Sequence, residues 1–175
     1  KLYRPEADTP LFTNDPKAER VVLRALQGTN LAPELIAAQG DSLVYRLAPG
    51  RGWQPEDGVA CVAERLTRLH AMEAPEGLPR KPMGADFLVQ QTMSLGENVP
   101  VVGEDIPAPR EAFIHGDATA ANALVSDGRV TFIDWQCPGV GDACDDIAVF
   151  LSPAMQVISG NRPLTEDEVE DFLAA

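Results

Sequence analysis

Four polar side chains between positions 115 and 134 have the types and the spacing that phosphoryl-transfer chemistry needs. His115 and Asp117 follow the short apolar run Ala112–Ile114, and Asn122 and Asp134 come later in the same stretch. Carboxylate and amide oxygens are ligands that suit Mg²⁺, which also keeps room for phosphate oxygens. Asp117 is a third oxygen group, free to act as a base. A base, an amide ligand and a carboxylate ligand, in this order, match kinase-type phosphoryl transfer.

The segment between Asn122 and Asp134 predicts the element that positions these groups. Residues 123–126 and 130–133 have the pattern of two short strands, and Asp127–Gly128 between them is a strong hairpin signal. A two-residue loop places Asn122 diagonally across from Asp134, and a three-residue loop places the two directly opposite each other. Either register brings the amide and the carboxylate to one end of the hairpin.

The stretch HGDATAAN, followed by FIDWQ, resembles the catalytic loop and metal-binding segment of the aminoglycoside phosphotransferase family, which includes choline-kinase-like enzymes. The later segment GDACDDIA is similar to the family's Gly-Asp-x3-Asp-Leu-Ala. The resemblance implies that Asp117 is the catalytic residue and that Asn122 and Asp134 bind the metal. It also implies that His115 and Asp146 support the loop. The alternative is an Asp-rich turn system in which Asp117 and Asn122 act only as caps.

Near the start of the chain, the same resemblance selects a lysine and a glutamate. Asp15 and Pro16 indicate a helix start, and Gly28 ends that helix. The expected apolar stripe consists of Ala18, Val21, Val22, Ala25 and Leu26, with Glu19 one step away. In kinase-like folds a strand lysine pairs with such a glutamate and holds the nucleotide phosphates. KLYRP and AERVVLRAL resemble that pair, so Lys1 and Glu19 are the candidates for ATP binding; the alternative is two ordinary surface charges.

Residues 34–39 and 42–48 form a second predicted hairpin. By the resemblance, its second strand runs into the linker between two lobes. Val44, Tyr45 and Arg46 would then border the adenine of ATP with their backbone groups. The alternative for these residues is an ordinary strand.

Three further amphipathic segments complete the predicted helical part. They begin at Pro55, at the cap Asp142, and at the capping box that starts with Thr165. His70, on the first of them, is expected to be a buried and hydrogen-bonded histidine rather than a ligand. Another helix is expected within 84–96. Residues 135–141 are expected to form a loop, because they include one proline and two glycines.

The order of elements predicts an α+β fold. By the resemblance it is a protein-kinase-like, two-lobed fold, with a small partial N-terminal β lobe over residues 1–48 and a mainly helical C-terminal lobe over residues 49–175. The family covers the nucleotide phosphates with a strand–loop–strand upstream of the lysine. The chain is therefore expected to be a fragment of a longer enzyme, without the first strands of the N-terminal lobe and the last helices.

Composition narrows the choice of partners. The net charge of −13, from 14 basic and 27 acidic residues, argues against nucleic acid and favours a cationic substrate, although general solubility explains most acids equally well. No apolar run is long enough to span a membrane. The three cysteines lack metal-like spacing and are expected to be free thiols in a reducing cytoplasm.

The predicted function is ATP- and Mg²⁺-dependent phosphorylation of a hydroxyl on a small molecule. An aminoglycoside, a choline-like amine, a sugar and an amino alcohol all fit as the acceptor. One alternative is a nucleotide-binding, pseudokinase-like module without turnover, which would be expected to lack an Asp or Asn of the motif. Another is a metal-dependent hydrolase using Asp117 and Asp134, which would need more ligands than the one other histidine, His70, provides.

Overall fold

The computed structural model describes residues 1–3, 14–84, 93 and 111–175. Three small antiparallel sheets hold the strands in the orders β1-β2, β3-β5-β6 and β4-β7. The elements in chain order are α1 (Pro16–Ala25), β1 (Leu35–Gln39), β2 (Ser42–Tyr45), β3 (Arg51–Gly52), the 3-10 helix η2 (Pro55–Asp57), α2 (Ala60–His70), β4 (Ala112–Ile114), the 3-10 helix η3 (Ala120–Asn122), β5 (Ala123–Ser126), β6 (Arg129–Phe132), β7 (Gly139–Gly141), α4 (Ala143–Leu151), α5 (Pro153–Ile158) and α6 (Glu166–Ala174).

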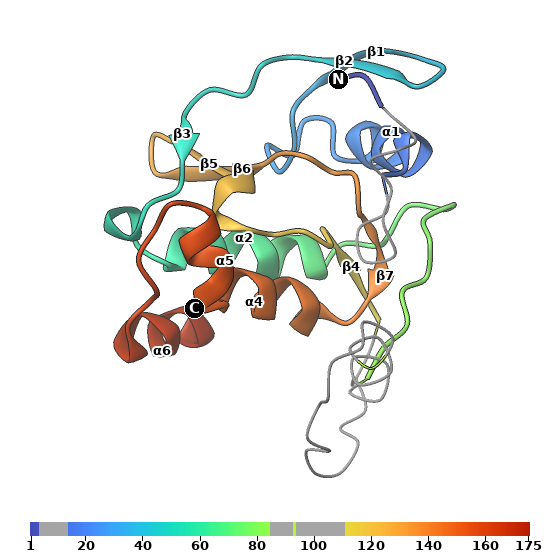
Figure 1. The fold of residues 1–175 in the computed structure, drawn as a ribbon. Helices are drawn as coiled ribbons and strands as arrows, with labels where there is room; N and C mark the ends of the chain where they lie inside the picture. Colours follow the sequence, from blue (N-terminus) through green and yellow to red (C-terminus); the bar gives the residue numbers. More distant parts are fainter. Residues whose placement is uncertain (4–13, 85–92, 94–110) are drawn as a thin grey trace.

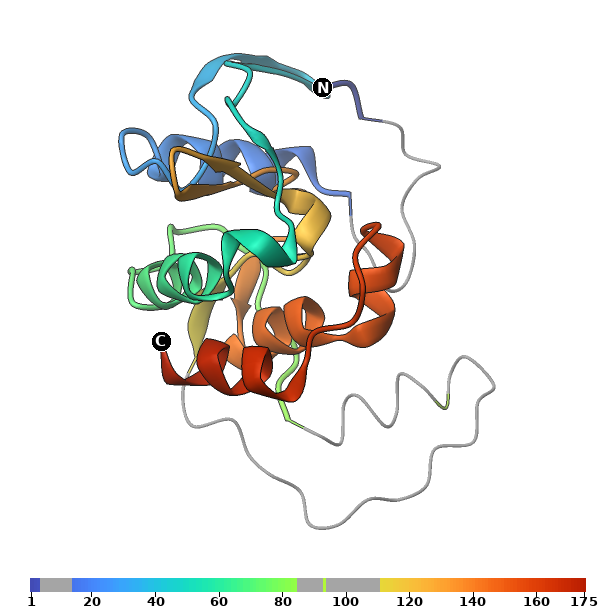
Figure 2. The ribbon, with the colours of Figure 1, turned by 90° about the vertical axis from the view of Figure 1, so that its left-hand side faces the viewer.

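The described elements are arranged in an upper and a lower part. Figure 1 shows β1, β2 and α1 at the top, the β5–β6 hairpin below them, and α2, α4 and α6 beneath the hairpin. In the side view of Figure 2, the β1–β2 hairpin again lies at the top, α1 and the β5–β6 hairpin lie level with each other beneath it, and α2, α4 and α6 lie lowest. A small sheet part thus faces a mainly helical part, as the sequence predicts.

The β5–β6 hairpin has the two-residue loop that is one of the two expected registers. Ser126 pairs with Arg129 across the turn, and both turn residues, Asp127 and Gly128, have positive φ values of 51° and 70°. Positive φ at both central positions is the geometry of a type I′ turn, which matches the twist of a hairpin. Beyond the last pair, the Ile133 N–H donates to the Asn122 carbonyl oxygen at 2.9 Å. The register thus brings Asn122 to the strand end that leads into Asp134.

Helix α1 begins where the sequence predicts. The Asp15 carboxylate accepts hydrogen bonds from the backbone N–H groups of Lys17 and Ala18, and Pro16 occupies the first turn. The expected stripe is partly wrong, because Ala25 is exposed and Leu23 is buried. The buried face includes Glu19, since α1 packs against the β1–β2 hairpin with that side turned inward.

The predicted loop over 135–141 is wrong for its last three residues, which form β7 and pair with β4. Two glycines make this possible because they leave room for a third segment. A Cβ at Gly139 would lie 2.9 Å from the Pro79 carbonyl oxygen, and a Cβ at Gly141 would lie 3.1 Å from the Lys81 Cβ. Residues 79–81 run beside β7, with the Lys81 N–H donating to the Val140 carbonyl oxygen at 2.8 Å.

The other helices follow their capping signals with small shifts. The helix expected from Pro55 divides into η2 and α2, separated by Gly58, which has a φ of 78°. Asp142 caps α4, and Thr165 caps α6 in a reciprocal capping box with Glu168. Helix α5 was not predicted. The helix expected within 84–96 lies, apart from residues 84 and 93, outside the described residues.

One hydrophobic core joins the two parts. Trp53 packs edge-on against Phe150 with ring centroids 5.1 Å apart, and Phe150 stacks on Phe172 at 5.2 Å. These rings hold α4 and α6 beneath the strands. None of the three cysteines forms a disulfide. Within the described residues, no helix is both long and apolar enough to cross a bilayer.

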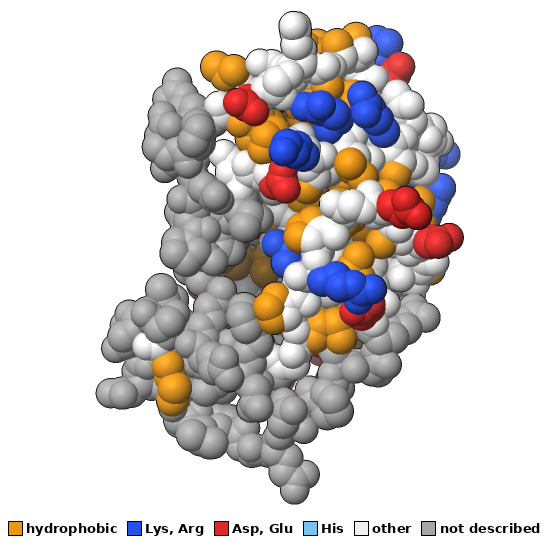
Figure 3. Space-filling view, turned by 90° about the vertical axis from the view of Figure 1, so that its right-hand side faces the viewer, with side chains coloured by type: hydrophobic (Ala, Val, Ile, Leu, Met, Phe, Trp, Pro, Cys, Tyr) orange, Lys and Arg blue, Asp and Glu red, His pale blue; other side chains and the backbone are white. Residues whose placement is uncertain are grey.

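The charged side chains on the face shown in Figure 3 are mixed in sign. Basic and acidic groups are interspersed there, with hydrophobic side chains between them. The large acidic excess of the chain is therefore not gathered into one acidic patch on the visible part of this face.

Candidate active site

Both ring nitrogens of His115 make hydrogen bonds that hold the loop after β4. The Nδ1 atom of His115 accepts a hydrogen bond from the Asp117 N–H at 3.2 Å, so Nε2 carries the proton and donates to the Ile133 carbonyl oxygen at 3.0 Å. The ring is fully buried, 4.3 Å from the Trp135 ring between centroids. Burial lowers the pKa of His115 and favours this neutral form. His115 thus joins the loop to the end of β6.

The carboxylate of Asp146, in the first turn of α4, binds the backbone of the same loop. It accepts the N–H groups of His115 and Gly116, each at 2.8 Å, and also contacts His70 Nε2 at 2.9 Å. Asp146 is fully buried. The His70 side chain is 9% exposed, and its contact with Asp146 confirms the prediction of a hydrogen-bonded structural histidine.

Asp117 and Asn122 face each other across this loop. The Asn122 Nδ2 group donates to the Asp117 carboxylate oxygen Oδ2 and to the Asp117 carbonyl oxygen, both at 2.9 Å. Burial raises the pKa of Asp117 to about 6, and the negative charge of Asp134 adds to this effect, while the hydrogen bond from Asn122 opposes it. A carboxyl group with such a pKa is suited to take up a proton near neutral pH.

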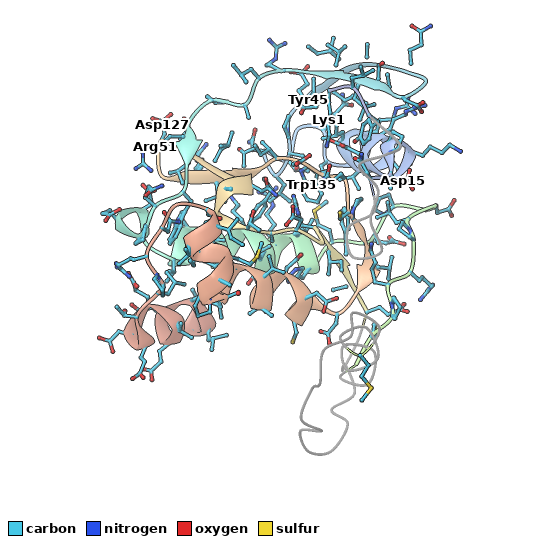
Figure 4. All side chains as sticks on the ribbon, viewed as in Figure 1. Lys1, Asp15, Tyr45, Arg51, Asp127 and Trp135 are labelled. Carbon is cyan, nitrogen blue, oxygen red and sulfur yellow. The ribbon has the colours of Figure 1, made fainter. Side chains whose placement is uncertain are left out.

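Asp134 follows β6 in a left-handed conformation with a φ of 61°, which is uncommon for a residue with a side chain. Its carboxylate contacts the ammonium group of Lys1, which also donates to Glu19 Oε2 at 2.9 Å. We refer to Lys1, Glu19 and Asp134 as the lysine cluster. Figure 4 places Lys1 between the β1–β2 hairpin and the segment that carries Trp135. The cluster therefore joins the upper part of the fold to the β5–β6 hairpin.

Electrostatics favours the charged form of Lys1. Burial works against its ammonium group, but the hydrogen bond to Asp134 and the charge of Glu19 outweigh this and raise the pKa of Lys1. The Glu19 side chain is 1% exposed, and burial raises its pKa despite the attraction of Lys1. A buried glutamate beside a lysine keeps the ammonium group in one place.

The three predicted adenine-contacting residues differ in their surroundings. Tyr45 faces the lysine cluster, and burial raises the pKa of its phenol, with a further contribution from the charge of Glu19. Val44 is 53% exposed, and the Arg46 side chain pairs with Glu34 at 2.8 Å. The Arg46 N–H donates to the Glu34 carbonyl oxygen at 2.8 Å, so it belongs to the β1–β2 hairpin.

Sequence reasoning missed two residues beside the lysine cluster. Gln136 Oε1 lies 3.4 Å from Lys1 Nζ, and the Gln136 carbonyl oxygen accepts the N–H of the α1 cap, Asp15, at 3.3 Å. Tyr3 places its ring 4.9 Å from Lys1 Nζ, which is cation–π distance. The only signal for them in the sequence is proximity: Gln136 lies two residues after Asp134, and Tyr3 lies two residues after Lys1.

A third missed residue lies on the other side of the loop. The Ser159 hydroxyl oxygen, just after α5, accepts the Ala121 N–H at 3.3 Å. Because α5 was not predicted, nothing in the sequence placed this hydroxyl near the loop.

The oxygen groups of Asn122 and Asp134 fit a hard divalent cation. The Nδ2 group of Asn122 is committed to Asp117, which leaves its carbonyl oxygen Oδ1 as the group available to a metal. The Asp134 carboxylate already forms an ion pair with a cation, the Lys1 ammonium group. Within the described residues, no group of three or more His, Cys, Asp or Glu side chains is arranged to hold a metal ion. The metal-binding prediction therefore depends on one amide and one carboxylate, with phosphate oxygens as the remaining ligands.

Solved structures with this fold were found by comparison. A choline/ethanolamine kinase family protein from Mesorhizobium loti is 17% identical, with a TM-score of 0.65, over 91% of this chain and 58% of that chain. The macrolide 2'-phosphotransferase MphH from Brachybacterium faecium is 21% identical, with a TM-score of 0.66, over 98% of this chain and 65% of that one. The ternary complex of streptomycin, ATP and APH(2")-IIa is 16% identical, with a TM-score of 0.59, over 90% and 66%.

These similarities confirm the kinase-like α+β fold, and the chain spans 58–66% of the length of these three relatives. No curated protein sequence matches the chain. The model of the phosphotransferase enzyme family matches residues 13–175, which include Glu19, the His115–Asn122 loop and Asp134. The chain belongs to the phosphotransferase enzyme family.

Proposed function

We propose that the protein transfers a phosphoryl group from ATP to a hydroxyl of a small molecule, with Mg²⁺ bound at Asn122 and Asp134. One observation carries this proposal. The Asp117–Asn122 pair and the lysine cluster meet at one end of the β5–β6 hairpin, so that an aspartate, an amide, a second aspartate and a lysine are grouped together. This grouping matches the needs of kinase-type phosphoryl transfer.

Each side chain has a role that its surroundings support. Asp117 accepts or orients the proton of the attacking hydroxyl, as its raised pKa allows. Lys1, held by Glu19, binds the α- and β-phosphates of ATP. His115 and Asp146 keep the loop in shape from behind. When bound, the metal would neutralise charge on the transferring phosphoryl group.

We propose a cationic amine or amino alcohol as the acceptor. The net charge of −13 favours the approach of cations over anions. Choline and ethanolamine, named for one structural relative, and streptomycin, named in the complex with another, are cationic at neutral pH. The absence of disulfides among the three cysteines supports a reducing compartment, the cytoplasm, as the site of action.

The test is ADP release by the purified protein with Mg²⁺-ATP over a panel of aminoglycosides, amino alcohols and sugars. We expect one class to stimulate turnover. Asp117→Asn should lower kcat by about 10²–10⁴-fold, the usual contribution of a general base. A matched control is Asp127→Asn, which changes an exposed aspartate in the hairpin turn and should leave kcat unchanged.

Two other outcomes separate the alternatives. Nucleotide binding without turnover for any acceptor would favour a pseudokinase-like module. ATP hydrolysis or ester cleavage that needs no acceptor would favour a hydrolase.

The metal assignment has its own test. Removal of Mg²⁺ with a chelator should abolish turnover, and readdition of Mg²⁺ should restore it. Turnover that persists without Mg²⁺ would reject the assignment of Asn122 and Asp134.

A further inference from the structure

A polar pocket lies at the opposite end of the β5–β6 hairpin from the lysine cluster. The pocket is open to solvent on one side, and its volume is about 340 Å³. Its lining residues are Cys61, Glu64, Arg65, Arg68, Gly128 and Arg129. The first four belong to α2, and the last two to the hairpin turn and the start of β6. Figure 4 shows the labelled turn residue Asp127 far from Lys1 and Tyr45, so the two sites are separate.

The two elements bring their arginines together by simple geometry. Arg65 and Arg68 are three residues apart on α2 and therefore share one face of the helix. Helix α2 packs against β6, whose buried Val130 follows the exposed Arg129. The packing of Val130 leaves Arg129 at the edge of that contact, beside the two helical arginines.

These arginines are not explained by ion pairing. Arg46, Arg51, Arg80 and Arg162 each contact a carboxylate. Within the described part of the chain, Arg65, Arg68 and Arg129 form no such ion pair. Burial lowers the pKa of Arg65, and the positive charges of Arg68 and Arg129 lower it further, with Glu64 as the opposing carboxylate. Like charges have thus been placed together, at an energetic cost that a bound anion would remove.

We propose that this pocket binds a small molecule that carries a phosphate group. Three guanidinium groups and one carboxylate line it, which leaves two uncompensated positive charges to match a phosphate dianion. Guanidinium groups bind phosphate through paired hydrogen bonds. The volume is within the range of small-ligand pockets, so there is room for more than the phosphate itself. None of the active-site side chains lines this pocket, so the proposal does not depend on the reaction proposed above.

The direct test is calorimetric titration of the protein with inorganic phosphate and with a hexose phosphate, in metal-free buffer. We expect saturable binding of both, tighter for the hexose phosphate because the pocket has room for more than the phosphate itself. Arg129→Gln and Arg68→Gln, both at exposed positions, should each weaken binding about tenfold or more, because each removes a charged hydrogen-bond donor. Arg24→Gln, an exposed arginine on α1, is the matched control and should bind as the wild type does.

The active-site lysine is a competing phosphate site, and a second variant separates the two. Lys1→Met should keep the binding that Arg129→Gln loses. A position-specific readout is the rate at which Cys61, in the pocket, is alkylated, measured by mass spectrometry. Phosphate should slow the reaction of Cys61 several-fold and leave that of the exposed Cys144 unchanged.

Three results would overturn the proposal. The first is phosphate binding that is lost in Lys1→Met and retained in Arg129→Gln. The second is an absence of saturable binding for both phosphate probes. The third is equal protection of Cys61 by acetate and by phosphate at equal ionic strength, which would indicate simple charge screening.

Discussion

At Gly116 the backbone has a φ of 78°, and a Cβ there would lie 2.0 Å from the Cys137 carbonyl oxygen. The same residue donates its N–H to Asp146. We predict that Gly116→Ala lowers the free energy of unfolding by roughly 2–4 kcal/mol, because it adds both strain and a backbone clash. Urea unfolding followed by circular dichroism measures this change.

Gly128→Ala is the control for the conformational part of that effect. Gly128 has a similar φ of 70°, but a Cβ there meets nothing within 4 Å. This variant should cost about 1–2 kcal/mol, the price of a left-handed residue alone. Equal losses for the two variants would mean that the contact with Cys137 is not what requires a glycine at position 116.

Asp117 illustrates a conflict between activity and stability at one residue. Its pKa in the folded chain is about 6, against an ordinary 3.8. Between these values the folded state binds more protons than the unfolded state, so this group's contribution to stability rises as the pH falls. At pH 7 the charged carboxylate therefore opposes folding, while its partner Asn122 holds it in place.

We predict that Asp117→Asn, although its kcat is strongly reduced, is more stable than the wild type at pH 7. The gain should be on the order of 1 kcal/mol after allowance for solvent screening of this half-buried group. In metal-free buffer the gain should shrink as the pH falls from about 6 toward 3.8, because Asp117 takes up its proton in the folded state over this range. Denaturant unfolding at pH 7 and pH 3.5 tests this, and a variant that is less stable at both pH values would contradict it.

Among the helices, α6 shows how a cap and an ion pair stabilise one end. Glu168 accepts the Thr165 N–H at 2.8 Å and pairs with both terminal nitrogens of Arg162, each at 2.7 Å. Arg162, together with the Thr165 N–H, lowers the pKa of Glu168 to about 2. This helix then places Phe172 on the aromatic stack of the core.

We predict a pH-dependent contribution of Glu168 to stability. Because its pKa in the folded state is below its ordinary value of 4.5, its contribution is fully present above pH 4.5 and is lost as the pH falls toward 2. Glu168→Gln should therefore be less stable than the wild type at pH 7, and the difference should narrow by pH 3. Glu166→Gln, in the same first turn, is the control; an equal loss there would point to the helix dipole instead.

For the molecule as a whole, the contacts that matter are those between the upper and lower parts. Lys1 reaches Asp134, and the N–H of the α1 cap reaches Gln136. Without nucleotide, the Lys1 ammonium group neutralises the carboxylate that we assign to the metal. Metal and nucleotide should therefore bind together, since the phosphates draw Lys1 away from Asp134.

We predict that Mg²⁺ alone changes the melting temperature of the wild type little, whereas Mg²⁺-ATP raises it by several degrees. In Lys1→Met, Asp134 loses its partner, so Mg²⁺ alone should stabilise this variant while Mg²⁺-ATP adds less. Lys17→Met, an exposed lysine on α1, is the control. Thermal unfolding with each ligand measures the effect, and a strong response of the wild type to Mg²⁺ alone would reject this coupling.

The sequence by itself determined the features that depend on neighbouring residues. Asp127–Gly128 specified the turn and so the register that brings Asn122 toward Asp134. Asp15, Asp142 and Thr165 marked the starts of three helices through side-chain bonds to residues two or three positions away. Such interactions are made within one turn of chain, so the local pattern contains them.

Only the tertiary structure decided which of these local units meet. Lys1 and Asp134 are 133 residues apart, and the packing of α1 and β2 above the hairpin brings them into contact. The pairing of β7 with β4 and the meeting of Arg129 with α2 likewise depend on surfaces distant in sequence. A hydrophobic pattern indicates which face of an element is buried, but the partner of that face is selected by the packing of the whole core.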